Sequence, residues 1–156
     1  MTFLLLVLFL QTTDCPMHHQ HMVDARHDTF GMSHDTTQHA FRLLTDGGAI
    51  ELRSLTKDDQ VAAIQKHMRE VTSDFSRGDF EKPLFVHGVM PDGAARMKEL
   101  GAAITYTFEA LPDGGRIRIT TTNAEALKAV HEFLRFQIKD HGTKDSSTAI
   151  PPDTPS

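Results

Sequence analysis

Histidine and methionine are concentrated in one stretch of this chain, residues 17–39. Six of the ten histidines lie there, together with three of the seven methionines and three aspartates. Imidazole nitrogens bind zinc, copper, nickel and iron, thioethers favour Cu(I), and carboxylates favour harder ions. The stretch therefore predicts a divalent metal site, with Zn or Cu favoured. Calcium is the alternative, through Asp24, Asp28 and Asp35.

Spacing narrows the set of candidate ligands. His19 and His21 place two imidazoles within reach of one ion on an extended backbone, and a turn could bring Asp24 and His27 to it. The metal-ligand candidates are His19, His21, Asp24, His27, His34, His39 and His87. Because the spacings match no known chelate well, we expect the stretch to form one wall of a site. The other wall would come from His39, His87 and His131.

Three interpretations of the stretch remain open at the level of sequence. It could be a flexible His/Met-rich arm that takes up metal weakly, a defined site folded against the domain, or a set of histidines without a metal role.

The chain has none of the common nucleophile motifs. It contains no G-x-S-x-G, no Gly-rich phosphate loop and no CxxC, and its one cysteine is Cys15. An enzyme built on this chain would use a bound metal to activate water or polarise a carbonyl. Asp24 and Asp28 are the nearest candidate bases. His131, on the apolar stripe of the last expected helix, is another catalytic candidate, and its simpler interpretation is a core histidine.

Three functions therefore compete. The first is an exported, small divalent-metal-binding domain. The second is a metal-dependent hydrolase of a small ester or lactone, such as an acyl-homoserine lactone, which would have a small-molecule substrate. The third is a protein-interaction domain whose histidines are bystanders. Whether the protein is an enzyme is left uncertain by the sequence.

The elements that would position these residues form two similar units. Asp46-Gly47-Gly48 separates two runs of β character and predicts a hairpin, and apolar spacing predicts a helix over 57–76. Asp113-Gly114-Gly115 separates two further strands, and a helix is expected from Asn123 to about Asp140. These units indicate a pseudo-repeat of ββα.

Two shorter elements are expected between the units, a strand over 83–87 and a helix over 91–100. The predicted fold class is α+β: a two-layer sandwich of order ββαβαββα, with helices on one face of a mostly antiparallel sheet. The expected organisation is a signal-like segment (1–15), a His/Met-rich segment (16–40), an α+β domain (41–141) and a disordered tail (142–156).

Composition limits the partners. The net charge of -5 gives no basic face for a nucleic-acid partner. The apolar run over residues 3–10 is too short to span a membrane, so no membrane span is expected. Its length fits the core of a signal peptide, although no Lys or Arg precedes it and no A-x-A site follows. We therefore expect an exported protein, periplasmic or secreted, or a cytoplasmic one if this run is not a signal.

From His19 to about Asp145 the chain resembles a group of small His-rich bacterial proteins of unassigned function, often mislabelled aspartate carbamoyltransferase. The motifs that carry the resemblance are H-x-H-M at 19–22, G-M at 31–32, T-T-x-H-x-F at 36–41, D-G-G-x-I-E at 46–51 and HEFLRFQIKDH at 131–141. Ala40 departs from the group, which often has a histidine there. The resemblance implies an exported or membrane-proximal domain but no reaction. A carbamoyltransferase subunit needs two α/β domains and a Ser-Thr-Arg-Thr loop, which this chain lacks.

Overall fold

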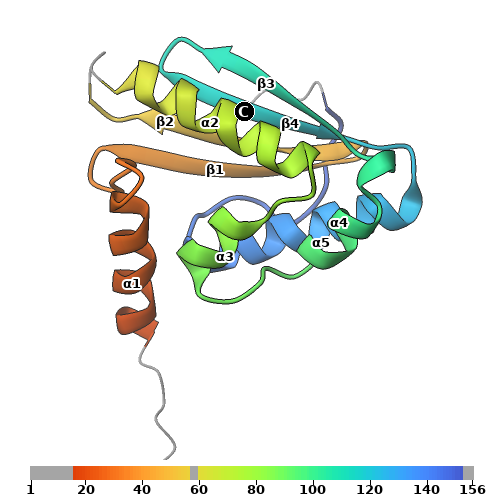
Figure 1. The fold of residues 1–156 in the computed structure, drawn as a ribbon, viewed down its shortest axis with the longest axis horizontal. Helices are drawn as coiled ribbons and strands as arrows, with labels where there is room; N and C mark the ends of the chain where they lie inside the picture. Colours follow the sequence, from red (N-terminus) through yellow and green to blue (C-terminus); the bar gives the residue numbers. More distant parts are fainter. Residues whose placement is uncertain (1–15, 57–59, 153–156) are drawn as a thin grey trace, which may run out of the picture.

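A four-stranded antiparallel sheet forms one layer of the protein. The computed structural model describes residues 16–56 and 60–152 (Figure 1). The strands are β1 (Thr37–Leu44), β2 (Gly47–Ser54), β3 (Thr105–Leu111) and β4 (Gly114–Thr120). Their order in the sheet is β1-β2-β4-β3, so two hairpins meet along β2 and β4. The α+β class and the antiparallel sheet predicted from the sequence are confirmed.

The glycines of the two D-G-G turns allow the hairpins to join. A Cβ on Gly47 would lie 2.0 Å from the carbonyl oxygen of Ile119, and a Cβ on Gly114 would lie 2.0 Å from that of Leu52. The φ of Gly47 is also +148°, a backbone conformation that favours glycine. The same close approach thus occurs once in each hairpin, which is the physical basis of the repeated motif.

Two long helices cover one face of the sheet. Helix α2 (Val61–Ser76) packs against β3 and β4, and α5 (Ala124–Asp140) packs against β1 and β2. Asn123 caps α5, as expected, by accepting a hydrogen bond at Oδ1 from the Ala126 N–H at 3.0 Å. The predicted start of α2 at residues 57–59 lies outside the described residues. Each hairpin is therefore followed by a helix that packs on the same face.

The predicted strand over 83–87 is wrong, because this segment is helix α3 (Glu81–His87). The Asp79 carboxylate accepts a hydrogen bond from the Glu81 N–H at 2.9 Å, and Gly88 ends the helix with a φ of +72°. Pro83 lies in the first turn, where a missing N–H costs nothing. Helix α4 (Ala94–Glu99) and a 3-10 turn, η1 (Gly101–Ala103), follow. The element order is therefore ββαααββα after the N-terminal helix.

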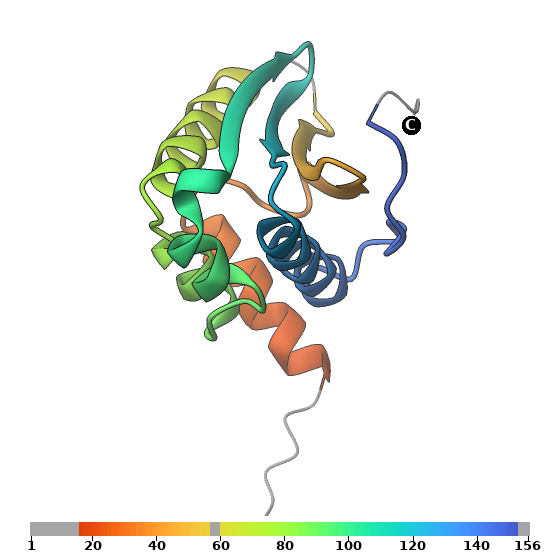
Figure 2. The same cartoon turned by 90° about the vertical axis from the view of Figure 1, so that its right-hand side faces the viewer.

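The histidine-rich segment and the tail are both folded onto this core. Helix α1 (Pro16–Asp28) contacts α3, and its Val23 side chain is fully buried. After α5 the chain turns back beside β1 (Figure 2). There Ile150 exchanges backbone hydrogen bonds with Leu43 and Thr45 at 3.1 and 3.0 Å. The tail was expected to be disordered from residue 142, whereas the structure gives 142–152 a defined course along β1.

Gly93 lets α4 approach α5, the helix that ends beside the histidines described below. Its φ is +78°, and a Cβ there would lie 2.2 Å from the carbonyl oxygen of Ala129. We expect Gly93→Ala to destabilise the protein by roughly 2 kcal/mol or more, measured by urea unfolding. Gly101→Ala is the matched control, because a Cβ there meets nothing within 4 Å. Equal loss of stability in both variants would contradict this close approach.

Candidate metal centre

Four imidazole rings meet where the N-terminal segment crosses the end of α5. His27 lies near the end of α1, His34 in the loop before β1, His39 in β1, and His141 directly after α5. All six pairs of these rings have centroids 4.7–5.7 Å apart. We call these four residues the histidine cluster. It joins residues from both ends of the described chain.

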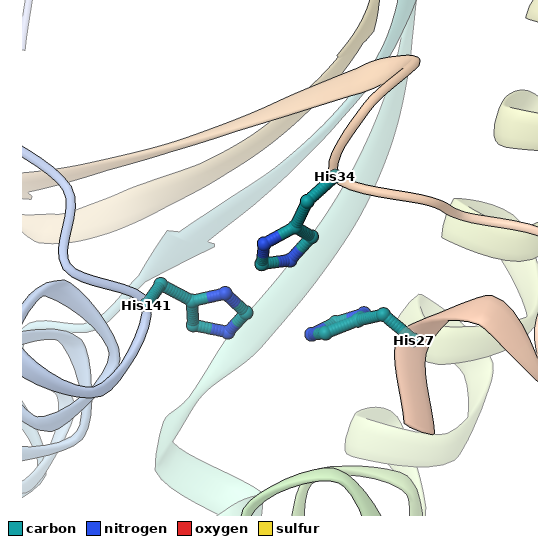
Figure 3. Close-up of side chains that lie close together, drawn as sticks. All are labelled: His27, His34 and His141. Atoms are coloured by element: carbon teal, nitrogen blue, oxygen red, sulfur yellow. The ribbon is translucent and has the colours of Figure 1, made fainter. Parts of the chain in front are cut away.

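Three members of the histidine cluster could share one metal ion. His27, His34 and His141 each offer a ring nitrogen, and these atoms lie within 4.8 Å of one another. Figure 3 shows the three rings gathered around a common space. Zinc bonds to imidazole nitrogen at about 2.0–2.1 Å, so a small inward movement of the rings would bring all three nitrogens onto one ion. The geometry is that of an open three-histidine site.

The same three rings carry nitrogen atoms without a hydrogen-bond partner. His27 Nε2, His34 Nε2 and His141 Nδ1 are buried and find no partner within the described chain. Buried polar atoms are almost always hydrogen-bonded, because an unpaired one costs free energy. Three nitrogens that lack a partner within the described residues and lie at one place could share a metal ion.

Asp24 holds one of these rings in position. Its Oδ1 lies 2.8 Å from His34 Nδ1, on the side of the ring opposite to the unpaired Nε2. The side-chain amide of Gln20 donates to the same oxygen at 3.1 Å. Metal-binding histidines characteristically engage a carboxylate through their other nitrogen, which fixes the tautomer and the ring orientation. Asp24 therefore lies where it would support a metal ligand.

A second carboxylate, Asp140, lies beside the histidine cluster at the end of α5. Its Oδ1 is 2.7 Å from His19 Nε2, and its Oδ2 is hydrogen-bonded to His87 Nδ1. His87 Nε2 lies 2.9 Å from Gln137 Oε1, and the His87 ring contacts that of His141 at 5.1 Å. These contacts fasten α1 and α3 to the end of α5, and so help to hold His141.

Burial keeps three members of the cluster, His27, His39 and His141, uncharged at neutral pH. Burial first, and then the neighbouring His34, lower the pKa of His27 to about 3. Burial, with the nearby histidines, also holds the pKa of His39 and of His141 well below its usual value. A metal ion binds the neutral imidazole, so protons would not compete for the ring nitrogens of His27 and His141 at pH 7.

Cavities adjoin the cluster on two sides. One is a small cavity of about 80 Å³ whose walls are mostly apolar and which includes His27, His39 and His141. The other is a polar cleft lined by His34, His39, His141 and Thr143. The hydroxyl of Thr143 is buried without a partner in the described part of the chain. The cluster thus separates an apolar cavity from a polar cleft.

The structure brings together only part of the predicted set. His27, His34 and His39 meet in the cluster, Asp24 contacts His34, and His19 and His87 share Asp140. His21 is exposed on α1.

His131 lies apart from the cluster. Its Nε2 lies 2.9 and 3.0 Å from the carbonyl oxygens of Leu44 and Gly47, at the β1–β2 turn. It therefore ties α5 to the first hairpin.

His141 contributes one of the three converging nitrogens but is not among the candidates predicted from the sequence. It lies 107 residues after His34 in the numbering of the chain, so no local spacing marks it. One signal could have pointed to His141. It is the last residue of the HEFLRFQIKDH motif at 131–141, one of the motifs on which the family resemblance rests.

Comparison of the chain with protein-family models, with curated proteins and with solved structures gave no significant match. In the part of the chain that the structure describes, no helix is long and apolar enough to cross a membrane.

The lowered histidine pKa values predict how the metal-free protein responds to acid. The unfolded chain takes up protons at its histidines near pH 6.5, whereas folded His27 does so only near pH 3. The free energy of unfolding should therefore be largest above pH 6.5 and fall as the pH drops toward 3. Each such histidine contributes about 1.4 kcal/mol per pH unit.

Urea unfolding with a chelator between pH 7 and pH 4 measures this slope. His27→Gln should reduce it, whereas His21→Gln, at an exposed position, should leave it unchanged. The same slope in both variants and in the wild-type protein would show that His27 is not held neutral.

Proposed function

We propose that this protein is a small domain that binds a divalent transition-metal ion through His27, His34 and His141. The observation that carries the proposal is the convergence of three buried ring nitrogens that lack partners within the described chain. Imidazole donors suit Zn and Cu, whereas calcium prefers oxygen ligands. Zinc sites with three protein ligands keep a fourth position open. A zinc ion is therefore the first choice.

His39 is the natural neighbour of that fourth position. Its ring centroid lies 4.7 Å from that of His141 and 4.8 Å from that of His27, but its nitrogens fall outside the group of three. In this proposal His39 lies against the site without being required for the ion to bind.

The ion would also join distant parts of the fold. His27 and His34 belong to the N-terminal segment, and His141 follows the last helix. Binding to the folded state alone stabilises it by mass action. The metal would thus hold α1 against the end of α5. Export of the domain remains a prediction, because residues 1–15 lie outside the described chain. Its kinship with the small His-rich bacterial proteins also remains a prediction, because no compared protein matches the chain.

Metal binding can be tested on the full-length protein without an affinity tag. We expect one zinc ion per chain by elemental analysis after dialysis, and an unfolding temperature that rises on zinc addition and falls with chelator. His34→Ala removes one of three ligands, so it should weaken zinc binding by at least about a hundredfold in a competition assay with a coloured chelator.

Two variants distinguish zinc binding at this site from weak binding by the many histidines of the segment. Asp24→Asn weakens the support of His34 and should cost about 10–100-fold in affinity. His21→Ala removes an exposed histidine from the same segment and should leave the affinity unchanged. If His21→Ala lowered zinc binding as much as His34→Ala, the segment would be a weak metal-binding arm and not a defined centre.

A metal-dependent hydrolase of a small ester or lactone is the second candidate. It is favoured by an open three-histidine set that lies between an apolar cavity and a polar cleft. A zinc ion would supply Lewis acidity there, polarising a carbonyl and acidifying water. The apolar cavity would receive the acyl group, and the polar cleft would admit water.

For this candidate we expect hydrolysis of short-chain p-nitrophenyl esters or lactones that stops on chelation and returns when zinc is added. His34→Ala should abolish turnover, and Cys15→Ala should leave it unchanged. If the zinc-loaded protein hydrolyses none of these substrates, the hydrolase candidate is wrong and the metal-binding proposal still stands.

A further inference from the structure

We propose that the apolar cavity beside the histidine cluster binds a short-chain aliphatic monocarboxylate, with its carboxylate at the open metal position. This inference rests on the metal centre proposed above and names the class of ligand that the centre would take. The walls of the cavity, its charge and its volume each restrict a different property of the ligand.

The far walls of the cavity are mostly apolar. They come from the inner face of the sheet and from the faces of α2 and α5 that cover it. The apolar lining residues on these three elements are Phe41, Ile50, Met68, Val71, Phe75, Ile117 and Phe133, and the polar ones besides His39 are His67 and Gln137. Such walls retain an aliphatic group by the hydrophobic effect. The body of the ligand is therefore hydrocarbon.

The near wall consists of histidine rings. His27 and His141, two of the three proposed metal ligands, line the cavity, and so does His39. A molecule in the cavity therefore reaches the metal position with whichever end faces the histidines. That end is the polar one, because the other end meets walls that are mostly apolar.

Charge selects an anion for the polar end. Three neutral imidazoles leave the two positive charges of a divalent ion uncompensated, and no Asp or Glu occurs among the described lining residues. Lys82 also lines the cavity, with its ammonium group paired with Asp74 outside it. An anionic oxygen donor gains from this field, whereas an amine would be repelled. A carboxylate fits both requirements.

Size limits the chain length. The cavity volume of about 80 Å³ is well below the roughly 150 Å³ of an apolar cavity that accepts benzene. An aromatic ring is therefore too large, and a chain of about three carbons fits. Butyrate is the simplest molecule with this body and head group, and it is also the acid that hydrolysis of a butyryl ester would release.

The test uses the full-length protein loaded with Co(II), whose visible absorption reports on its ligands. Titration with butyrate should change the spectrum saturably. Acetate should bind about tenfold more weakly, because it lacks two methylene groups that leave water. Benzoate should also bind at least about tenfold more weakly, and 1-butanol should leave the spectrum unchanged.

Variants of Val71 test whether the cavity holds the chain. Val71→Phe should fill the cavity and weaken butyrate binding at least about tenfold, with Co(II) uptake unchanged. Val71→Ala enlarges the cavity and should bring benzoate binding up to that of butyrate. Val61→Phe, at the start of the same helix and outside the lining, is the matched control and should change neither. If Val71→Phe does not fold, Val71→Ala decides the question.

The possible outcomes test the carboxylate site independently of the metal centre. Stoichiometric Co(II) with no spectral response to butyrate, or with equal responses to acetate and butyrate in every variant, would overturn the carboxylate site and leave the metal centre standing. Failure to bind Co(II) or zinc would overturn both.

Discussion

The structure depends on a cluster of closely packed imidazoles that are only partly hydrogen-bonded. An ordinary core would pair these nitrogens or replace the rings with aliphatic side chains, because unpaired polar atoms lower stability. Here His27, His34 and His141 converge with a free nitrogen each, and Asp24 holds the second nitrogen of one of them. The arrangement is unfavourable for stability alone and favourable for binding a cation. Such a local conflict with packing rules is typical of a functional site.

The remainder of the fold can be understood as support for this cluster. The sheet places His39 and Phe41 on its helix-covered face, and α5 delivers His141 at its C-terminal end. Asp140, one residue earlier, engages His19 of α1 and His87 of α3, so one carboxylate links three helices. The N-terminal segment is thereby part of the domain. An apolar cavity and a polar cleft remain on either side, which gives the centre separate surroundings for hydrocarbon and for water.

Local signals predicted most of the elements. The two D-G-G turns, the alternating strands and the helices after them follow from short-range chemistry, and Gly47 and Gly114 then allow the hairpins to join. The segment over 83–87 was predicted as a strand because it is short and apolar. In the structure no sheet edge takes it up, and Asp79 and Gly88 supply helix start and stop signals instead. Short apolar runs are ambiguous between strand and helix, and tertiary packing decided this one.

By itself, the sequence determined the fold class, the likeness of the two ββα units and the concentration of potential metal ligands in residues 17–39, because these depend on residue type and short spacing. Only the tertiary structure decided which histidines meet. It joined His27 and His34 to His141, placed His21 in solvent, and gave His131 the carbonyl oxygens of the first hairpin as partners. The physical reason is that the atoms of a binding site must lie close together in the folded chain. Those distances are set by how α1 and α5 pack on the sheet, and no spacing along the chain records them.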